Sequence, residues 1–348
     1  MTSIATAQRG AIAGLALSVL VVVLAHGRAA AQSHPWIDPT LLAAARAEGT
    51  VTIYSSTNEQ EGLPLFKLFE DATGIRFNYI RGNDASLLSR VAIETRANQP
   101  SFDIIHISNA HKMPQNLLAQ SEPPEAKHIL EQARDANRRW YGVYTIYTTP
   151  AYNTQRVSAA DLPRSFEEFA QRTQWAGKVA IDYTDLEWLR GMLQFHGEQK
   201  GTELVRRIVA GLKPVLTDGR LAMARSVAAG EYLFALNNFV NLTLNVKLAG
   251  GPIEVWPLDP VTLFFGQVGV NAKAPHPNAA RLAANFMLSR ECQQFLARFG
   301  RLPTRNDVES KPPGIVARLT QKKVVTVLMS PDEERKWQRQ FDQLLRGR

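Results

Sequence analysis

The chain has almost no cysteine. Cys292 is the single cysteine among 348 residues, so no internal disulfide can form and the fold must be held by its core. Cys292 lies in the helical segment "RLAANFMLSRECQQFLARF". In that setting we expect a buried, inert thiol and not a nucleophile.

The motifs of the common enzyme classes are also missing. The sequence has no G-x-S-x-G elbow, no H-E-x-x-H helix, no Walker-type loop and no dinucleotide-binding glycine fingerprint. A periplasmic hydrolase that uses Asp182 and a histidine is the enzymatic alternative, but no residue spacing supports it. We therefore expect no catalysis and no cofactor.

Long runs of one charge are absent as well. Lysine and arginine number 40 against 32 acidic residues, a formal net charge of +8, and these charges are scattered along the chain. This pattern gives no support to a nucleic-acid partner and leaves room for a small anionic ligand. A hydrophobic content of 45% with 21% charged residues is typical of a soluble globular protein of one large or two medium domains.

The N-terminus has the order of a secretory signal peptide. Arg9 precedes an apolar run from Ala11 to Ala25, and Ala29, Ala30 and Ala31 supply the small residues of a cleavage site. A membrane anchor is the alternative, but the run is short for a bilayer span. No cysteine stands near the site for lipid attachment. We expect export to the periplasm and a mature chain that begins near Gln32.

Beyond the signal sequence, strands and helices alternate. Segments 49–57 and 75–82 have strand patterns, 61–74 and 84–98 have helical spacing, and the alternation resumes after residue 140. Such alternation predicts an α/β fold in which mostly parallel sheets are flanked by helices. We expect two lobes, joined by extended segments near 140–150 and 255–265. The charged tail, 330–348, predicts an exposed amphipathic helix.

Small polar residues follow five of the predicted strands. Ligands of open α/β sheets collect at the carboxyl ends of strands, although any one of these residues could equally be a helix cap or a turn. Arg220 stands at the start of a helix whose amides could hold an anion. The ligand-binding residues expected on these grounds are Ser56, Thr57, Asn58, Asn83, Ser108, Asn109, Asp182, Tyr183, Arg220, Asn238 and Phe239.

The stretch "ALNNFVNLTL" (235–244) places three asparagines in an apolar strand pattern. A buried amide without partners costs a few kcal/mol, so these amides either are satisfied inside the fold or face a ligand. Because they follow a predicted strand, we expect Asn237 and Asn238 to line a cleft. His106 and His111 lie five residues apart without a nearby third ligand, so we expect no metal site there.

Several segments between residues 48 and 310 resemble one protein family. "VGVNAKAPHPNAARLAANFMLSRECQQFLARFGRLPTRNDV" (268–308) is similar to the closing module of bacterial periplasmic solute-binding proteins that serve ABC importers. "VTIYSSTNEQEGLPLFKLFEDATGIRFNYIRG" and "RSVAAGEYLFALNN" resemble the ferric-iron-binding branch of that family. The resemblance covers roughly residues 48–310.

The resemblance implies a two-lobed type II periplasmic binding fold that encloses its ligand by hinge closure. It implies a monomer that captures a small-molecule solute and docks on ABC permease subunits through both lobes. The boundaries we expect are 1–31 for the signal peptide, 32–145 and 258–310 for the first lobe, 146–257 for the second lobe and 311–348 for a C-terminal helical segment.

The sequence departs from the ferric branch at its metal-binding positions. In that branch two adjacent tyrosines follow the asparagine, but here Phe239 and Val240 occupy those positions. The first loop, Ser56 to Glu59, also has no histidine. We therefore expect an organic or oxyanion solute, with Phe239 as an apolar wall. A ferric protein with a relocated site and a sensor accessory are the alternatives.

The solute class stays open between a phosphonate, a phosphate ester, a carboxylate and a polyamine. The basic balance and the helix-terminus loops favour an anion.

We predict that export removes the first 31 residues, because the apolar run is followed by the small residues of a cleavage site. N-terminal sequencing of the exported protein should begin near Gln32. An uncleaved, membrane-bound product would contradict this prediction.

Overall fold

The computed structural model describes residues 34–99 and 101–346 of the chain. The predicted signal sequence, 1–31, lies outside the described residues. Within the described part, no helix is both long enough and apolar enough to cross a membrane.

One continuous sheet runs through the described chain, in the order β2-β1-β3-β9-β4-β7-β5-β6, with β8 and β10 added to β4 and β11 added to β9. The strands are β1 (Thr50–Ser55), β2 (Arg76–Arg81), β3 (Ile104–Ile107), β4 (Trp140–Asn153), β5 (Val179–Asp182), β6 (Val215–Thr217), β7 (Phe234–Phe239), β8 (Ile253–Val255), β9 (Val261–Val270), β10 (Leu302–Pro303) and β11 (Val324–Thr326).

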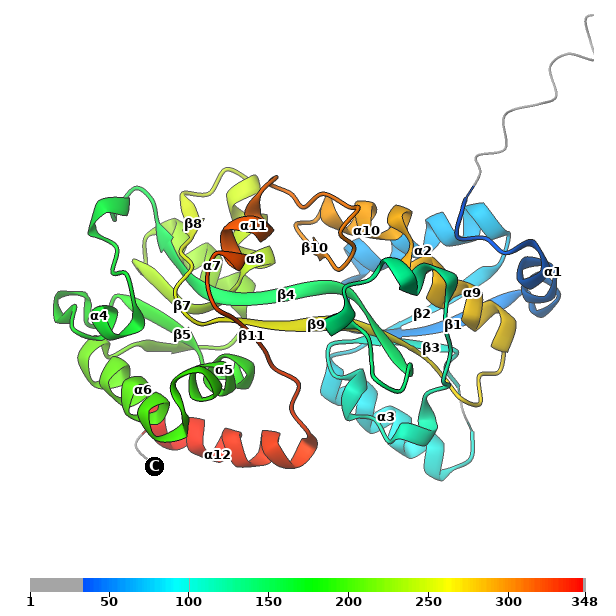
Figure 1. Cartoon of the computed structure of the whole chain (residues 1–348), viewed down its shortest axis with the longest axis horizontal. Helices are drawn as coiled ribbons and strands as arrows, with labels where there is room; N and C mark the ends of the chain where they lie inside the picture. Colours follow the sequence, from blue (N-terminus) through cyan, green and yellow to red (C-terminus); the bar gives the residue numbers. More distant parts are fainter. Residues whose placement is uncertain (1–33, 100, 347–348) are drawn as a thin grey trace, which may run out of the picture. The chain divides into compact units, whose positions relative to one another are not determined.

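The helices cover both faces of this sheet (Figure 1). They are α1 (Pro39–Glu48), α2 (Glu59–Thr73), α3 (Asp84–Arg96), α4 (Phe166–Ala170), α5 (Leu186–His196), α6 (Glu198–Leu212), α7 (Arg220–Ala229), α8 (Val240–Leu248), α9 (Pro277–Leu288), α10 (Arg290–Ala297), α11 (Ile315–Thr320) and α12 (Pro331–Arg346).

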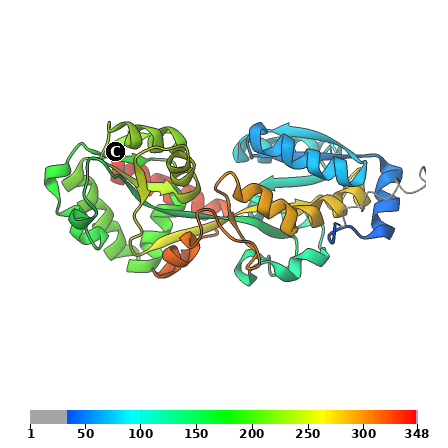
Figure 2. The same cartoon turned by 90° about the horizontal axis from the view of Figure 1, so that it is seen from above.

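Two parallel blocks make up the two ends of the sheet. In the first lobe β1 pairs in parallel with β2 and β3, and in the second lobe β5 pairs in parallel with β6 and β7. The long strands β4 and β9 pair antiparallel with each other and run between the two blocks (Figure 2). The expected α/β fold is confirmed. The extended segment expected near 140–150 lies within β4, whereas the one expected near 255–265 overlaps only the first half of β9, which begins at Val261. The two blocks are parts of one sheet because β9 pairs with β3 of the first block, β4 pairs with β7 of the second, and β4 and β9 pair with each other.

Each lobe has an aromatic core. In the first, the rings of Phe69 and Phe286 lie 5.6 Å apart, between helices α2 and α9. In the second, Phe169 packs edge-on against Phe234 and Trp256, with ring centroids 5.1 and 5.0 Å away. Burial of this much apolar surface stabilises each lobe without a disulfide, as the cysteine content requires.

Local capping signals in the sequence are found in the structure. The Ser165 hydroxyl accepts a hydrogen bond from the Glu168 amide at the start of α4, as expected of an N-cap. Cys292 is buried on α10, and its backbone amide donates a hydrogen bond to the hydroxyl of Ser289, the N-cap of that helix. Burial raises the pKa of the Cys292 thiol, so the prediction of an inert thiol is consistent with its surroundings.

The C-terminal tail forms the predicted helix, α12, but this helix is not simply exposed. Trp337 and Phe341 on its apolar face are buried in the second core, together with residues of α5 and α6. Figure 1 shows α12 lying against α5 and α6. The sequence pattern correctly predicted the amphipathic character of this helix. It did not predict the packing against α5 and α6, because these helices lie more than a hundred residues away in the chain.

We predict that Phe341→Ala destabilises the second core. The side chain is fully buried, and such a truncation costs about 3–5 kcal/mol of unfolding free energy. Chemical denaturation should show this loss, whereas Arg335→Ala, at an exposed position of the same helix, should change it by less than about 0.5 kcal/mol. Equal effects of the two substitutions would contradict the packing of α12.

Candidate functional site

The carboxyl ends of β1, β2 and β3 meet at one edge of the first lobe. Ser56, half-buried, follows β1 directly, and Ser108 and Asn109, also half-buried, follow β3. Asn83 follows β2 and caps α3, its side-chain oxygen accepting from the Ser86 amide at 2.8 Å. Parallel pairing in the order β2-β1-β3 is what brings these loops to the same edge.

Asp84 ties these loops together. One carboxylate oxygen accepts a hydrogen bond from the Ser108 amide at 2.9 Å. Burial raises the pKa of Asp84, while hydrogen bonds from the Ser56 side chain and from the Ser108 and Asn109 amides oppose that rise. Asp84 was not among the expected site residues. Its position as the first residue of α3, next to the predicted residue Asn83, is the sequence signal that could have identified it.

Asp182 has the corresponding role in the second lobe. This fully buried carboxylate accepts hydrogen bonds from the Thr184 amide (2.9 Å) and hydroxyl (2.6 Å) and from the Gly219 amide (3.1 Å). Gly219 has a φ of +107°, which glycine adopts readily and other residues rarely do. The loops after β5 and β6 therefore converge on one carboxylate, immediately before Arg220.

Arg220 lies over the face of Phe239. Its guanidinium carbon is 4.1 Å from the ring centroid, and its nitrogen Nη2 is 3.8 Å from Asp182 and 3.7 Å from Asp185. Both carboxylates are fully buried, whereas the Arg220 side chain keeps 17% of its surface exposed. Phe239 is itself supported edge-on by Phe264 at 5.4 Å. We call Arg220, Asp182, Asp185 and Phe239 the arginine clamp.

Two atoms of the arginine clamp are buried and have no hydrogen-bond partner among the described residues: Nε of Arg220 and Oδ2 of Asp185. The distances from Arg220 to the carboxylates are those of ion pairs and too long for hydrogen bonds. Burial raises the pKa of Asp185 to about 7, with the positive charge of Arg220 opposing the rise. The guanidinium thus retains donors that the fold does not use.

The adjacent asparagines have different surroundings from those we expected. The Asn237 amide accepts from the Asp182 backbone amide at 2.8 Å and donates to the Asp182 carbonyl at 2.9 Å. Asn238 donates to the Thr243 hydroxyl at 2.8 Å, and its buried side-chain oxygen has no hydrogen-bond partner among the described residues. Both side chains are fully buried. The expectation that Asn237 and Asn238 line a cleft is therefore wrong, because Asn237 bonds the backbone of Asp182 and Asn238 bonds Thr243 of α8.

Six of the expected site residues fall into two groups, and Asn238 belongs to neither. Ser56, Ser108 and Asn109 gather around Asp84, and Asp182, Arg220 and Phe239 gather in the arginine clamp. Thr57 is buried beneath the first group, while Asn58 and Asn83 are exposed at its rim. Tyr183, half-buried, donates to an Asp218 carboxylate oxygen at 3.3 Å. Sequence reasoning did not identify Asp84, Asp185 and Phe264.

The positions that would ligate iron carry no ligating atoms. Phe239 ends β7, and Val240, buried, begins α8. His106 is fully buried beside the Ser55 hydroxyl (3.2 Å), and burial lowers its pKa to about 3. His111 pairs with Gln267 and with the Met329 carbonyl. In the described part of the chain, no three His, Cys, Asp or Glu side chains are placed to hold a metal ion together.

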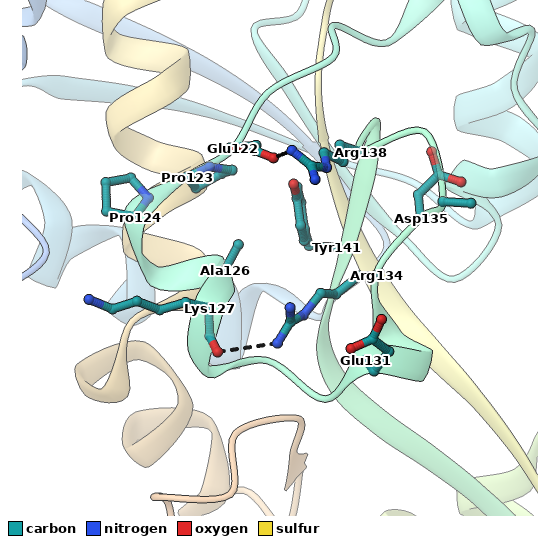
Figure 3. Close-up of a pocket in the computed structure, with 11 residues that line it drawn as sticks. Glu122, Pro123, Pro124, Ala126, Lys127, Glu131, Arg134, Asp135, Arg138 and Tyr141 are labelled. Carbon is teal, nitrogen blue, oxygen red and sulfur yellow. Dashed lines mark hydrogen bonds and ion pairs between the residues drawn. The ribbon is translucent and has the colours of Figure 1, made fainter.

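A surface pocket of about 470 Å³ lies elsewhere on the first lobe, lined by residues between Glu122 and Tyr141 (Figure 3). Several of its polar side chains are already paired. Arg134 donates to the Lys127 carbonyl at 3.2 Å, Arg138 pairs with Glu122, and the Tyr141 hydroxyl donates to the Ser121 carbonyl at 2.6 Å. None of the expected site residues lines this pocket, and we do not assign the ligand to it.

We predict that Asn237→Ala lowers stability. The substitution leaves the buried backbone amide and carbonyl of Asp182 without their side-chain partner, which costs about 1–3 kcal/mol of unfolding free energy. Thermal or chemical denaturation of the ligand-free protein measures this loss. Asn245→Ala, at an exposed position of α8, is the matched control. An unchanged stability for Asn237→Ala would contradict its structural role.

Comparison with known proteins supports the family resemblance found in the sequence. The Fe(3+)-binding periplasmic protein of Serratia marcescens is 24% identical over 198 residues, which are 54% of this chain and 56% of that protein, so the match spans about half of the relative's length. Iron-bound HitA from Pseudomonas aeruginosa superposes with a TM-score of 0.72 at 22% identity, covering 84% of this chain and 99% of HitA.

The periplasmic binding protein AfuA from Actinobacillus pleuropneumoniae, with exogenous fructose-6-phosphate bound, gives a TM-score of 0.69 at 19% identity and covers 85% of this chain and 98% of AfuA. These likenesses establish the two-lobed periplasmic binding fold. The model of one family, bacterial extracellular solute-binding protein, matches residues 99–321. The chain therefore belongs to the bacterial extracellular solute-binding proteins.

Proposed function

We propose that this protein is the periplasmic binding component of an ABC importer and that its solute is a small organic anion held by the arginine clamp. The proposal rests on the position of Arg220 and on its unused hydrogen-bond donor. Its guanidinium lies over Phe239 beside two buried carboxylates, its side chain is partly exposed, and its buried Nε has no acceptor among the described residues. A carboxylate, phosphate or phosphonate supplies the acceptors that such a fork can bind in pairs.

The surroundings of Arg220 support an organic anion more than a metal ion. Phe239 offers an apolar face, and the Asp84 group offers hydroxyl and amide side chains at the strand ends of the other lobe. Pockets for organic ligands combine an apolar wall with a few fixed polar groups. Because burial favours the protonated form of Asp185, the negative charge close to Arg220 is lower than two ionised carboxylates would give.

Ferric iron is the second candidate, since the named functions of the Serratia marcescens protein and of HitA concern iron. A ferric site here would need ligands other than Phe239, which ends β7, and Val240, which begins α8, because their side chains have no ligating atom. AfuA, with bound fructose-6-phosphate, is a protein of the same fold that holds a phosphorylated solute. A sensor accessory would use the same binding site as a transport protein. The two functions are distinguished by solute uptake: a transport protein is required for uptake through a permease, and a sensor accessory is not.

We predict that Arg220→Gln weakens solute binding by about 10- to 150-fold, the effect of losing a charge-assisted contact. The solute is first identified by thermal-shift screening of the mature protein against phosphate esters, phosphonates, carboxylates and polyamines, and Kd is then measured by calorimetry. Arg225→Gln, on the exposed face of the same helix, is the matched control and should leave Kd unchanged.

The melting temperature of each ligand-free variant is measured alongside Kd, so that a folding defect is distinguished from lost contact. Stabilisation by polyamines alone, or an unchanged Kd for a well-folded Arg220→Gln protein, would overturn the proposed function.

A further inference from the structure

The C-terminal segment connects the second lobe to the first through one buried lysine. Lys112 ends a short 3-10 helix, η1 (Ala110–Lys112), which follows β3, and its neighbours Ala110 and Met113 are buried in the first core. Its ammonium lies 3.0 Å from the carboxylate of Glu334 on α12. Since α12 is anchored in the second core by Trp337 and Phe341, this ion pair joins side chains that belong to different lobes.

The chain between β11 and α12 makes a second contact at the same place. The Val327 amide donates to the Leu263 carbonyl of β9 at 2.8 Å, which continues the β11 pairing. Two residues later, the Met329 carbonyl lies 3.1 Å from Nε2 of His111. In Figure 1 the chain leaves β11 and turns into α12 below α5. The segment from Val327 to Glu334 thus bridges the two lobes beside the crossing strands.

The two members of the ion pair are buried very unequally. The Lys112 side chain is 4% exposed, whereas that of Glu334 is 42% exposed. No hydrogen bond to the Lys112 ammonium is formed within the described residues, so the ion pair with Glu334 is its close interaction. Asp84 and Glu187 also lie within reach of its charge, one in each lobe, but neither is a close ion-pair partner of Lys112. A buried ammonium that loses its carboxylate is strongly disfavoured.

We propose that Lys112 and Glu334 form an ion-pair joint that couples α12 to the arrangement of the two lobes. A larger distance between the lobes would separate Lys112 from Glu334, the carboxylate that lies 3.0 Å from its buried ammonium. The joint brings η1, with the neighbouring Ser108 and Asn109, toward the lobe that carries the arginine clamp. It therefore favours the arrangement in which both groups can contact one solute.

The unequal burial gives the joint a specific mutational signature. Glu334→Gln leaves a buried, uncompensated ammonium, and we expect the ratio of the present lobe arrangement to more separated ones to fall by on the order of 10-fold. Lys112→Met removes the buried charge and leaves a carboxylate that water can reach, so this arrangement should persist. The double variant Lys112→Met/Glu334→Gln should behave like Lys112→Met and not like Glu334→Gln.

The experiment measures the distance between the lobes without any solute, so its outcome does not depend on the proposed anion. Spin labels are placed on cysteines introduced at Ser89 of α3 and Ala210 of α6, both exposed, and the buried Cys292 does not react. Pulsed electron paramagnetic resonance then gives the distance distribution for each full-length mature variant. Glu203→Gln, which breaks an exposed ion pair with Arg206 within α6, is the matched control and should change nothing.

The joint is supported if longer distances appear in Glu334→Gln and disappear again in the double variant. It is overturned if Glu334→Gln keeps the distance distribution of the unsubstituted protein, or if the double variant shows the same longer distances as Glu334→Gln. Circular dichroism of each variant confirms that the distances come from folded protein.

Discussion

The candidate site depends on the hydrogen bonds of the buried residue Asp182. Its carboxylate accepts hydrogen bonds from the loops after β5 and β6, and its backbone amide and carbonyl both bond the side-chain amide of Asn237 on β7. Three strand ends are thereby held around one residue, and Arg220 begins its helix immediately after Gly219, the last of those partners. Hydrogen bonds from the Thr184 and Gly219 amides and the Thr184 hydroxyl occupy the Asp182 carboxylate, so this buried group has polar partners without contact with water.

A similar arrangement recurs in the first lobe on a smaller scale. Asp84 starts α3 and accepts the Ser108 amide, so the loops after β2 and β3 are fixed to each other. In both lobes an acid near a strand-to-helix turn fixes the positions of the polar groups around it. These contacts explain why several acids near the proposed site need not repel an anion: Asp182 and Asp84 are engaged by backbone amides, and burial favours the protonated form of Asp185.

Much of the fold could be predicted because it depends on local patterns. The strand and helix alternation, the crossing segments that became β4 and β9, and the Ser165 cap all follow from residues close in sequence. The partners of the asparagines could not be predicted in this way, since Asn237 bonds a residue 55 positions away. Asp185 and Lys112 were not predicted for the same reason. Asp185 pairs with Arg220 and Lys112 pairs with Glu334, and each partner is distant in sequence and comes close only in the folded chain.

We propose that the solute is recognised by a fixed guanidinium and neutral polar side chains, and not through phenolate-bound iron. Visible absorption of the mature protein, titrated with ferric citrate, tests this proposal most directly. We expect no phenolate-to-iron charge-transfer band, because Phe239 at the end of β7 and Val240 at the start of α8 stand where the ferric branch has its tyrosines. A strong band at stoichiometric iron would contradict the account, above all if it disappeared when phenylalanine replaced one of Tyr141, Tyr144, Tyr147 or Tyr183.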